Sequence, residues 1–470
     1  MRLYFYGLLM LFQKFILRRN TGRVVCAFAR RMGVVYIKMA QIIAMQNYGQ
    51  IFTENDRQAL SQICDHCNPI KFKKILQQLE AEYATPLDEL FQTIDPEPLG
   101  SASISQVHRA VLLDGREVAV KIKRHDVARR VEHDVNQVQR FVRRFGRMTK
   151  FRNYLGSDKA LLLWSKWIGE ETDFQHERQN LLDYQKFADS VNGKVPDTIK
   201  IKTPGIIPEL CTDNVIVMEL IKTPTVNQIA LTTENKQRIG RAINDYISLS
   251  FYALLQGIPV TFHGDPHSGN IYVDAAGNMG FLDMGLIFSF SGEEADFIRE
   301  LFLNAYNVRI DKLIKLLLDS SECTEFNYAE YRATIEAQAK RFRTTPVTQF
   351  FVEMINIYTR YNMAPPDIPF KMAKSFVALY GINNFIENRI DTKSLLAGQI
   401  AEYYIRRASS DLEKVTAGSL NFLPNLLINI TEQGVAKGLA TQAMALGDLK
   451  SDFQTTLEHC DELLGFFGSA

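Results

Sequence analysis

Two short segments carry side chains that could perform chemistry. The first, His-Gly-Asp-Pro-His-Ser-Gly-Asn, holds Asp265 and Asn270 in a loop of glycine and proline. The second, Phe-Leu-Asp-Met-Gly, places Asp283 after a short apolar run. Phosphoryl transfer needs an acid that orients or deprotonates the attacking hydroxyl, and oxygen ligands for the Mg²⁺ that bridges the phosphates. We therefore interpret Asp265 as the catalytic residue, and Asn270 and Asp283 as ligands of Mg²⁺.

The order of these residues, H-x-D-x-x-x-x-N and then D-x-G, matches the catalytic and metal loops of kinases. Asp and Asn also form turns that have no catalytic role, and one segment alone would leave that reading open. Both segments together, close in the chain, favour phosphoryl transfer. His267 stands where protein kinases carry a lysine, and either contact with a phosphate or a hydrogen bond that braces the loop would suit it.

A candidate phosphate-binding loop and a candidate lysine lie upstream. The loop consists of small residues and a following valine: Gly100, Ser101, Ala102, Ser103 and Val107. Only the first glycine of a G-x-G-x-x-G-x-V pattern is present, which restricts the backbone conformations available to the loop. The next strand ends in Val-Ala-Val-Lys, so Lys121 has the position of the lysine that holds the α- and β-phosphates of ATP. An exposed lysine on an edge strand is the alternative.

A carboxylate partner for Lys121 is expected near residue 177. On a helix, Asp173, Glu177 and Asn180 would fall on one face. Such a polar stripe is usually a solvated face. A pair between Lys121 and Glu177 would instead supply the Lys–Glu ion pair that kinases require, and we predict that pair.

The combination of motifs resembles the UbiB (AarF) family of atypical, protein-kinase-like ATPases associated with quinone biosynthesis. The family's K-x-G-Q motif is matched by Lys38 to Gln41, and its E-x-D motif by Glu171 and Asp173 ahead of Glu177. Its S-I-x-Q-V-H motif is matched by residues 103–108, and the H-x-D-P-H-x-G-N loop by residues 263–270. The resemblance covers roughly residues 34 to 400.

The resemblance implies a nucleotide site and a covered cleft. Lys38 and Gln41 would point into the cleft where a peptide substrate would dock, and would meet Glu171 and Asp173. The adenine would contact the backbone of the hinge at Met218, Glu219 and Leu220. Members of the family are thought to act as ATPases or small-molecule kinases. Three departures stand out: Ala40 replaces a glycine, Gly100-Ser101 replaces part of an alanine run, and Met284 replaces a phenylalanine.

The elements around these motifs predict an α+β, protein-kinase-like bilobal fold with helical N- and C-terminal regions. Residues 24–85 have a helical pattern, and two β-branched runs joined by Asp114-Gly115 predict a hairpin. Further strands are expected near 214–221 and 260–288, a long helix near 233–256, and helices from 292 onward. We expect four units: an extension (1–90), an N-lobe (91–222), a C-lobe (223–320) and a C-terminal helical region (321–470).

The composition and charge of the chain limit the kinds of partner and compartment that we expect for it. The chain of 470 residues has a net charge of +1, which argues against a nucleic-acid footprint, and six scattered cysteines indicate a reducing compartment. Cys64 and Cys67 have a metal-like spacing, but no second cysteine pair follows. Residues 1–53 contain eight Lys or Arg and no acid. The apolar run Leu3–Phe12 is too short to span a bilayer, so residues 1–31 predict either a helix on an anionic membrane surface or a docking helix with a solvated basic face. We expect a cytoplasmic protein that can lie at the inner membrane.

The function expected from these features is an ATPase or atypical kinase of the UbiB type that depends on Mg²⁺ and ATP. No A-P-E segment follows Asp283, so the chain lacks an activation segment long enough to dock a peptide. Water or a small acceptor, such as a lipid or a quinone precursor, is therefore expected. The alternatives are a phosphotransferase of the aminoglycoside- or choline-kinase type and a nucleotide-binding scaffold without activity.

Overall fold

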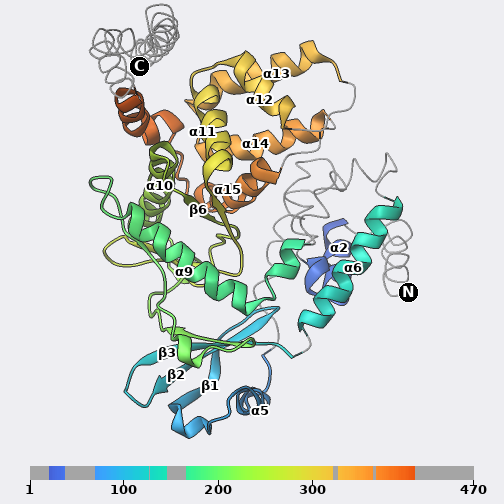
Figure 1. Cartoon of the computed structure of the whole chain (residues 1–470), viewed down its shortest axis with the longest axis vertical. Helices are drawn as coiled ribbons and strands as arrows, with labels where there is room; N and C mark the ends of the chain where they lie inside the picture. The colour runs from blue at the N-terminus through green and yellow to red at the C-terminus, as the bar shows by residue number, and fades with distance from the viewer. Residues whose placement is uncertain are drawn as a thin grey trace, which may run out of the picture.

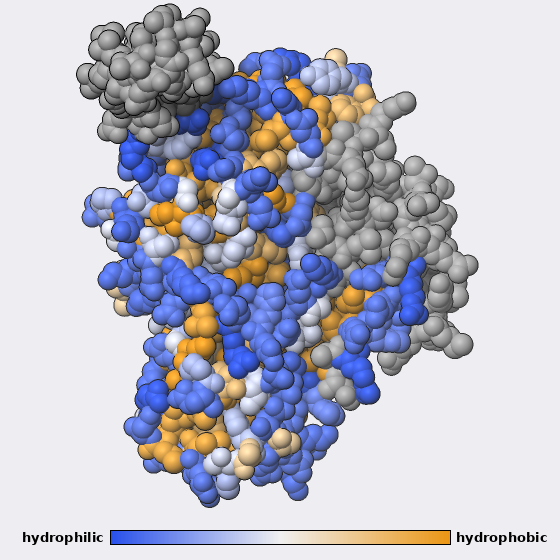
Figure 2. Space-filling model, in the orientation of Figure 1, coloured by the Kyte–Doolittle hydropathy of each residue, from blue (hydrophilic) through white to orange (hydrophobic). Residues whose placement is uncertain are grey.

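The computed structural model describes residues 21–37, 69–125, 127–145, 166–320, 326–361, 363 and 367–407. Two lobes are visible, one built on a sheet and one mostly helical, with helix α9 (Phe174–Val191) running between them (Figure 1). Figure 2 shows hydrophilic residues over most of this face, with hydrophobic patches over both lobes.

The N-lobe is a sheet of four strands in the order β1-β2-β3-β5. All three pairings are antiparallel, and the strands are β1 (Phe91–Ser101), β2 (Ser105–Leu112), β3 (Glu117–Lys123) and β5 (Val215–Glu219). The β2–β3 hairpin turns at Asp114-Gly115, where Gly115 has a φ of +84°. The sequence predicted this hairpin, because Asp-Gly readily adopts the positive φ that a tight turn requires.

One face of the sheet has its own hydrophobic core. Helix α5 (Phe72–Glu82) packs Ile75 and Leu79 against β-strand residues such as Val120 and Val217, and all four are fully buried. A short 3-10 turn, η1 (Leu87–Glu89), leads into β1. Strand β1 begins at Phe91, and register shifts in its pairing with β2 let it accommodate both of its prolines.

The C-lobe begins after β5. Its elements up to the strand that follows the second chemical segment are η3 (Val226–Gln228), α10 (Thr233–Gln256), β6 (Val260–His263), β7 (Ile271–Val273), β8 (Met279–Phe281) and β9 (Ile287–Phe290). Strand β6 pairs with β9, while β8 lies between β7 and the short strand β4 (Ile201–Lys202). A further 3-10 turn, η2 (Pro208–Leu210), precedes β5. Both chemical segments therefore lie in loops between short strands.

Helices complete the lobe. They are α11 (Gly292–Tyr306), α12 (Ile310–Asp319), α13 (Tyr328–Phe342), α14 (Val347–Arg360) and α15 (Asp367–Phe385), and residues 392–407 are also helical. One hydrophobic cluster runs from Trp167 to Tyr404, across the expected boundary at residue 320. The division into four units stays a prediction, but residues 326–407 share a core with the catalytic lobe.

The remaining described helices lie apart from this core. Helix α2 (Thr21–Met32) and helix α6 (Val127–Phe145) lie side by side, and the Cβ position of Gly33 is 3.7 Å from the Asp134 carboxylate (Figure 1). None of the helices in the described ranges is both long and apolar enough to cross a membrane.

Candidate active site

The centre of the site is a buried lysine held by two carboxylates. The Nζ of Lys121 lies 2.6 Å from Oε1 of Glu177 and 3.0 Å from Oδ2 of Asp283. Burial alone would favour the neutral amine, but the two carboxylates outweigh it and raise the pKa of Lys121 above its ordinary value. The predicted Lys121–Glu177 pair is present. The alternative of an exposed lysine on an edge strand is wrong, because Lys121 is buried and β3 lies between β2 and β5.

Two side chains of helix α9 form hydrogen bonds with the backbone of Met284 in the metal loop, which is the loop that carries Asp283. Oε1 of Glu177 accepts the Met284 N–H at 3.4 Å, and Nδ2 of Asn180 donates to the Met284 carbonyl at 2.9 Å. Glu177 and Asn180 are both buried, so the polar stripe on this helix is not a solvated face. The Oε2 atom of Glu177 has no hydrogen-bond partner among the described residues. The backbone after Asp283 is thereby tied to the element that carries the carboxylate partner of Lys121.

Asp173 does not share that face. It is the N-cap of α9, and its Oδ1 accepts the N–H groups of Gln175 and His176 at 2.9 and 3.2 Å. The expected stripe of Asp173, Glu177 and Asn180 is therefore wrong at its first member, because the helix begins at Phe174 and an N-cap residue has non-helical dihedral angles. Glu171 does approach the site: its backbone carbonyl oxygen is 3.9 Å from the Cβ position of Gly285.

The first chemical segment is organised by His263. Its Nδ1 accepts the Asp265 N–H at 3.0 Å, so the ring proton is on Nε2, which donates to the Asp283 carbonyl at 2.6 Å. Burial lowers the pKa of His263 to about 4, and the ring is therefore neutral at pH 7. Asp265 keeps a side chain that is 40% exposed. A neutral histidine thus joins the two loops while leaving the Asp265 carboxylate open to an acceptor.

Asn270 braces the metal loop. Its Oδ1 accepts the N–H groups of Leu282 and Asp283 at 3.0 and 2.7 Å, and its Nδ2 donates to the Asp283 carbonyl at 3.1 Å. Both lone pairs of the amide oxygen are engaged, so a metal contact from Asn270 would replace at least one backbone bond. The Asp283 carboxylate is half-exposed, which fits it to a hard cation such as Mg²⁺.

Two glycines permit close packing at the site. A Cβ at Gly264 would lie 2.6 Å from the Leu286 side chain and 3.0 Å from its carbonyl oxygen, to which the Gly264 N–H donates. A larger residue at Gly264 would therefore force the two loops apart. In the strands between the loops, a Cβ at Gly280 of β8 would overlap the ring of its register partner Tyr272 in β7.

The predicted phosphate loop is the tight connection between β1 and β2. The Ala102 N–H donates to the Ser105 carbonyl at 2.9 Å, which closes the turn. Arg124 then ties the loop to the end of β3: its Nε donates to the Ala102 carbonyl and its Nη2 to the Ser101 hydroxyl, both at 2.8 Å. The sequence reading missed Arg124, although its position three residues after Lys121 was a usable signal. Gly100 lies at the end of β1, and Val107 is the register partner of Lys121.

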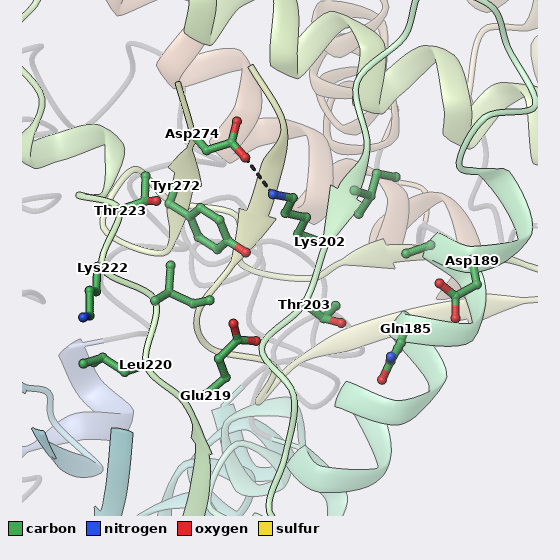
Figure 3. A pocket seen from close by; sticks show the side chains of 13 residues that line it. Gln185, Asp189, Lys202, Thr203, Glu219, Leu220, Lys222, Thr223, Tyr272 and Asp274 are labelled. Carbon is green, nitrogen blue, oxygen red and sulfur yellow. Dashed lines mark hydrogen bonds and ion pairs between the residues drawn. The ribbon is translucent and has the colours of Figure 1, made fainter. Parts of the chain in front are cut away.

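The predicted hinge consists of the last two residues of β5 and Leu220, which follows them. Met218 is buried and pairs with Ala119, whereas Glu219 is exposed and begins the passage to the C-lobe. Glu219 and Leu220 border a pocket of about 460 Å³ that also touches the end of α9, β4 and β7 (Figure 3). The hydroxyl of Tyr272 points into this pocket, while Lys202 pairs with Asp274 at 2.7 Å. Lys121, Glu177 and Asp283 do not line the pocket, so it is separate from the lysine centre.

A second, largely buried lysine, which sequence reasoning did not identify, reaches the catalytic loop. Lys374 lies on α15, its Nζ donates to the Gly264 carbonyl at 2.6 Å, and it is 3.9 Å from Oδ1 of Asp265. It is 109 residues downstream of Asp265 by the difference of their numbers, and no spacing rule links them. Only the packing of α15 against β6 brings the two residues together.

Several expected features lie outside the described residues. They are Lys38 and Gln41 of the K-x-G-Q match, the pair Cys64 and Cys67, and the first twenty residues of the basic N-terminus. His267 is described: its Nδ1 accepts the Gly269 N–H at 3.2 Å, as the bracing alternative expects. Within the described ranges, no three His, Cys, Asp or Glu side chains converge as a metal-binding cluster.

Comparisons with known proteins support the resemblance to atypical kinases that the sequence motifs indicated. The sequence profile of the ABC1 atypical kinase-like domain matches residues 62–317. The chain is 24% identical over 424 residues to a protein of Aliivibrio fischeri named probable protein kinase UbiB, covering 86% of this chain and 76% of that protein. The corresponding protein of Vibrio cholerae is 22% identical over the same length, again covering 86% and 76%.

Two solved structures show a more distant similarity to this chain. A Mycobacterium tuberculosis protein, described as the complex of Rv3197 with erythromycin, gives a TM-score of 0.48 at 21% identity and covers 73% of this chain and 85% of that one. The Rio2 kinase of Chaetomium thermophilum, solved with ADP, Mg²⁺ and phosphoaspartate, gives 0.25 at 13% identity, covering 57% and 77%. The profile match spans more than half of the chain, and together with the paired lysine and the two loops described above it places this protein in the ABC1 (UbiB) family of atypical kinase-like proteins.

Proposed function

We propose that this protein hydrolyses ATP, or transfers its γ-phosphoryl group to a small hydroxyl compound, with Mg²⁺ as cofactor. The observation that carries the proposal is the double contact of Lys121, whose ammonium meets Glu177 and Asp283 at once. Kinases need both the Lys–Glu pair and the metal-loop aspartate in place before they can turn over. A scaffold without activity would have no reason to keep an open Asp265 beside such an assembled centre.

Each residue then has a role. Lys121 would hold the α- and β-phosphates, and the turn closed by Ala102 and Ser105 would cover them. Asp283 would hold Mg²⁺, which when bound neutralises charge on the phosphates. Asp265 would orient or deprotonate the acceptor hydroxyl, because its carboxylate is exposed and its N–H is fixed by His263. The adenine would lie against the hinge at Met218 to Leu220.

A small acceptor is favoured over a protein. After Gly285 the chain enters β9 at Ile287 and α11 at Gly292, and β9 is paired with β6 along its length. This leaves no extended segment on which a peptide could dock. The acceptor we propose is water, a lipid or a phenolic quinone precursor, the last from the family resemblance, at an anionic membrane surface reached through residues 1–31.

The test is ATP turnover by the full-length protein. We expect phosphate release that requires Mg²⁺ and falls by about 10²-fold or more in Asp265→Asn while nucleotide binding is kept. Asp283→Asn should weaken binding of Mg·ATP in a thermal-shift titration. Asp311→Asn is the matched control, because Asp311 is an exposed residue of α12 that pairs with Arg332. Full activity in Asp265→Asn would contradict the proposal.

The acceptor is tested in parallel reactions. We expect turnover to rise with anionic liposomes or with a quinone-precursor-like phenol, and casein to remain unphosphorylated. Phosphorylation of an aminoglycoside or of choline would favour the rival reading as a small-molecule phosphotransferase. Phosphorylation of casein that Asp265→Asn abolishes would contradict the exclusion of protein substrates.

A further inference from the structure

Helix α15 lies beyond the matched domain, yet it forms part of the wall of the active site. The profile match ends at residue 317, and α15 begins at Asp367. Phe376 of this helix lies 5.5 Å from Phe262 of β6, ring centre to ring centre, just before the catalytic loop. Phe370 stacks on Trp167 at 5.7 Å, close to the Glu171 segment. Helix α15 is therefore packed both against β6, which leads into the catalytic loop, and against Trp167, which precedes the Glu171 segment.

Lys374 projects from this helix to the catalytic loop. Its side chain is only 12% exposed, and its Nζ donates to the Gly264 carbonyl at 2.6 Å. The N–H of the same glycine donates to the Leu286 carbonyl at 2.8 Å, so the residue just before Asp265 is held from two sides. The ammonium also lies 3.9 Å from Oδ1 of Asp265.

The cost of burying this cation indicates a specific role. Burial disfavours the charged amine and lowers the pKa of Lys374, and the Asp265 carboxylate opposes that effect. A buried ammonium is costly unless charge and hydrogen bonds compensate it, and here the compensation comes from the catalytic loop. The neighbouring Lys371 is different, because its Nζ pairs with Asp367 of the same helix at 2.5 Å and does not reach the loop.

We propose that Lys374 is a positioning residue for Asp265, supplied by the C-terminal helical region to complete the active site. It fixes the Gly264 peptide and places its Nζ beside the carboxylate, so that Asp265 stays aimed at the acceptor. The proposal rests on the proposed function, because it assigns Asp265 the acceptor-facing role. It also means that the lysine that holds the catalytic loop lies outside the matched domain of residues 62–317.

The test compares Lys374→Met, which keeps most of the unbranched side chain but removes the amine, with Lys374→Arg and the control Lys371→Met, all in the full-length protein. We expect kcat for ATP hydrolysis to fall about tenfold or more in Lys374→Met, with the KM for ATP changed less than twofold. Lys374→Arg should recover a large part of kcat. Lys371→Met should match the wild type.

A double-mutant cycle separates positioning from general stability. If Lys374 acts through Asp265, then Lys374→Met should reduce kcat little further when it is added to Asp265→Asn. Equal losses in both backgrounds, or a rise in the KM for ATP with kcat unchanged, would overturn the proposal. So would a wild-type kcat in Lys374→Met.

An activity-independent measurement keeps the two proposals apart. Hydrogen exchange of the peptide covering residues 262–270 should speed up in Lys374→Met and stay at the wild-type rate in Lys371→Met. If the wild type neither hydrolyses ATP nor transfers its γ-phosphoryl group to any acceptor tested, the proposed function fails, and the exchange rates still decide whether Lys374 fixes the loop. Unchanged exchange in Lys374→Met would overturn the positioning role whatever the activity.

Discussion

At the scale of single residues, the site is governed by the cost of buried charge. Lys121 and Glu177 are 6% and 1% exposed, and neither charge would be stable there alone. Asp283 is half-exposed, so it can leave the lysine for a metal without a comparable desolvation cost. The contact between Lys121 and Glu177 is therefore kept, whereas Asp283 can exchange its contact with Lys121 for a metal ion.

The difference in burial between Glu177 and Asp283 leads to a prediction for Lys121→Met. The change leaves the buried Glu177 carboxylate unpaired and should destabilise the protein by about 3–5 kcal/mol in urea unfolding, with weaker nucleotide binding. Adding Glu177→Leu removes the stranded charge and should restore much of the stability but not the binding. A double variant as unstable as the single one would show that the pair is not the source of the loss.

At the scale of elements, the S-I-x-Q-V-H match forms a hydrogen-bond network that joins β2 to the segment before α5. The amide of Gln106 exchanges two hydrogen bonds with the backbone of Ile70, at 2.7 and 3.2 Å. The Nδ1 of His108 donates to the Asp95 carbonyl at 2.8 Å, which leaves Nε2 to accept from Gln106 at 2.9 Å. Gln106 and His108 are fully buried, so this motif holds the phosphate-loop strand against its surroundings.

The network predicts a dependence of stability on pH. Burial lowers the pKa of His108, and the nearby Asp95 and Glu97 only partly oppose that effect. The folded state therefore binds the proton less readily than the unfolded chain, whose histidine pKa is about 6.5. The contribution of His108 to stability should be complete above pH 6.5 and should decline as the pH falls below that value.

Urea unfolding at several pH values tests this effect. His108→Gln should be less stable than the wild type at pH 8, by about 1–3 kcal/mol for the lost hydrogen bonds, and should show a shallower decline toward pH 5. His176→Gln is the control, since His176 is exposed on α9. Equal slopes in the wild type and His108→Gln would contradict the assignment of the neutral ring.

At the scale of the whole molecule, the catalytic lobe and the C-terminal helices share one core. Phe376 of α15 is fully buried and contacts the rings of Phe251, Phe262 and Phe351, which belong to α10, β6 and α14. The strand that carries His263 therefore rests on a helix more than a hundred residues downstream. Loosening that helix should affect catalysis even though its apolar residues do not line the site.

We therefore predict that Phe376→Ala destabilises the protein by about 3–5 kcal/mol and lowers ATP turnover under conditions where the variant is still folded. Phe385→Ala, at the exposed end of the same helix, should change neither quantity, because Phe385 is 70% exposed. Urea unfolding gives the stability, and turnover is compared well below the unfolding midpoint. A stable Phe376→Ala variant would contradict the shared core.

The sequence by itself determined the local features of this protein. The Asp114-Gly115 hairpin, the α10 helix, which has the predicted bounds 233–256, and the order of the two chemical segments all follow from local propensity and spacing. The partner of Lys121 could be predicted as well, because chemistry required a carboxylate on a following helix and Glu177 stood at a matching place. The N-cap at Asp173 was misjudged because element boundaries depend on packing and capping that a local pattern does not encode.

Only the tertiary structure decided which distant groups complete the site. Arg124 on the phosphate loop, Asn180 at Met284 and Lys374 beside Asp265 come from three elements, and their polar atoms find partners only once those elements pack. The same packing also gives Asn270, which stays a predicted metal ligand, hydrogen bonds to the backbone of the metal loop. The physical reason is that a buried polar group must find its partner in space, whereas a sequence shows only which groups have such a need.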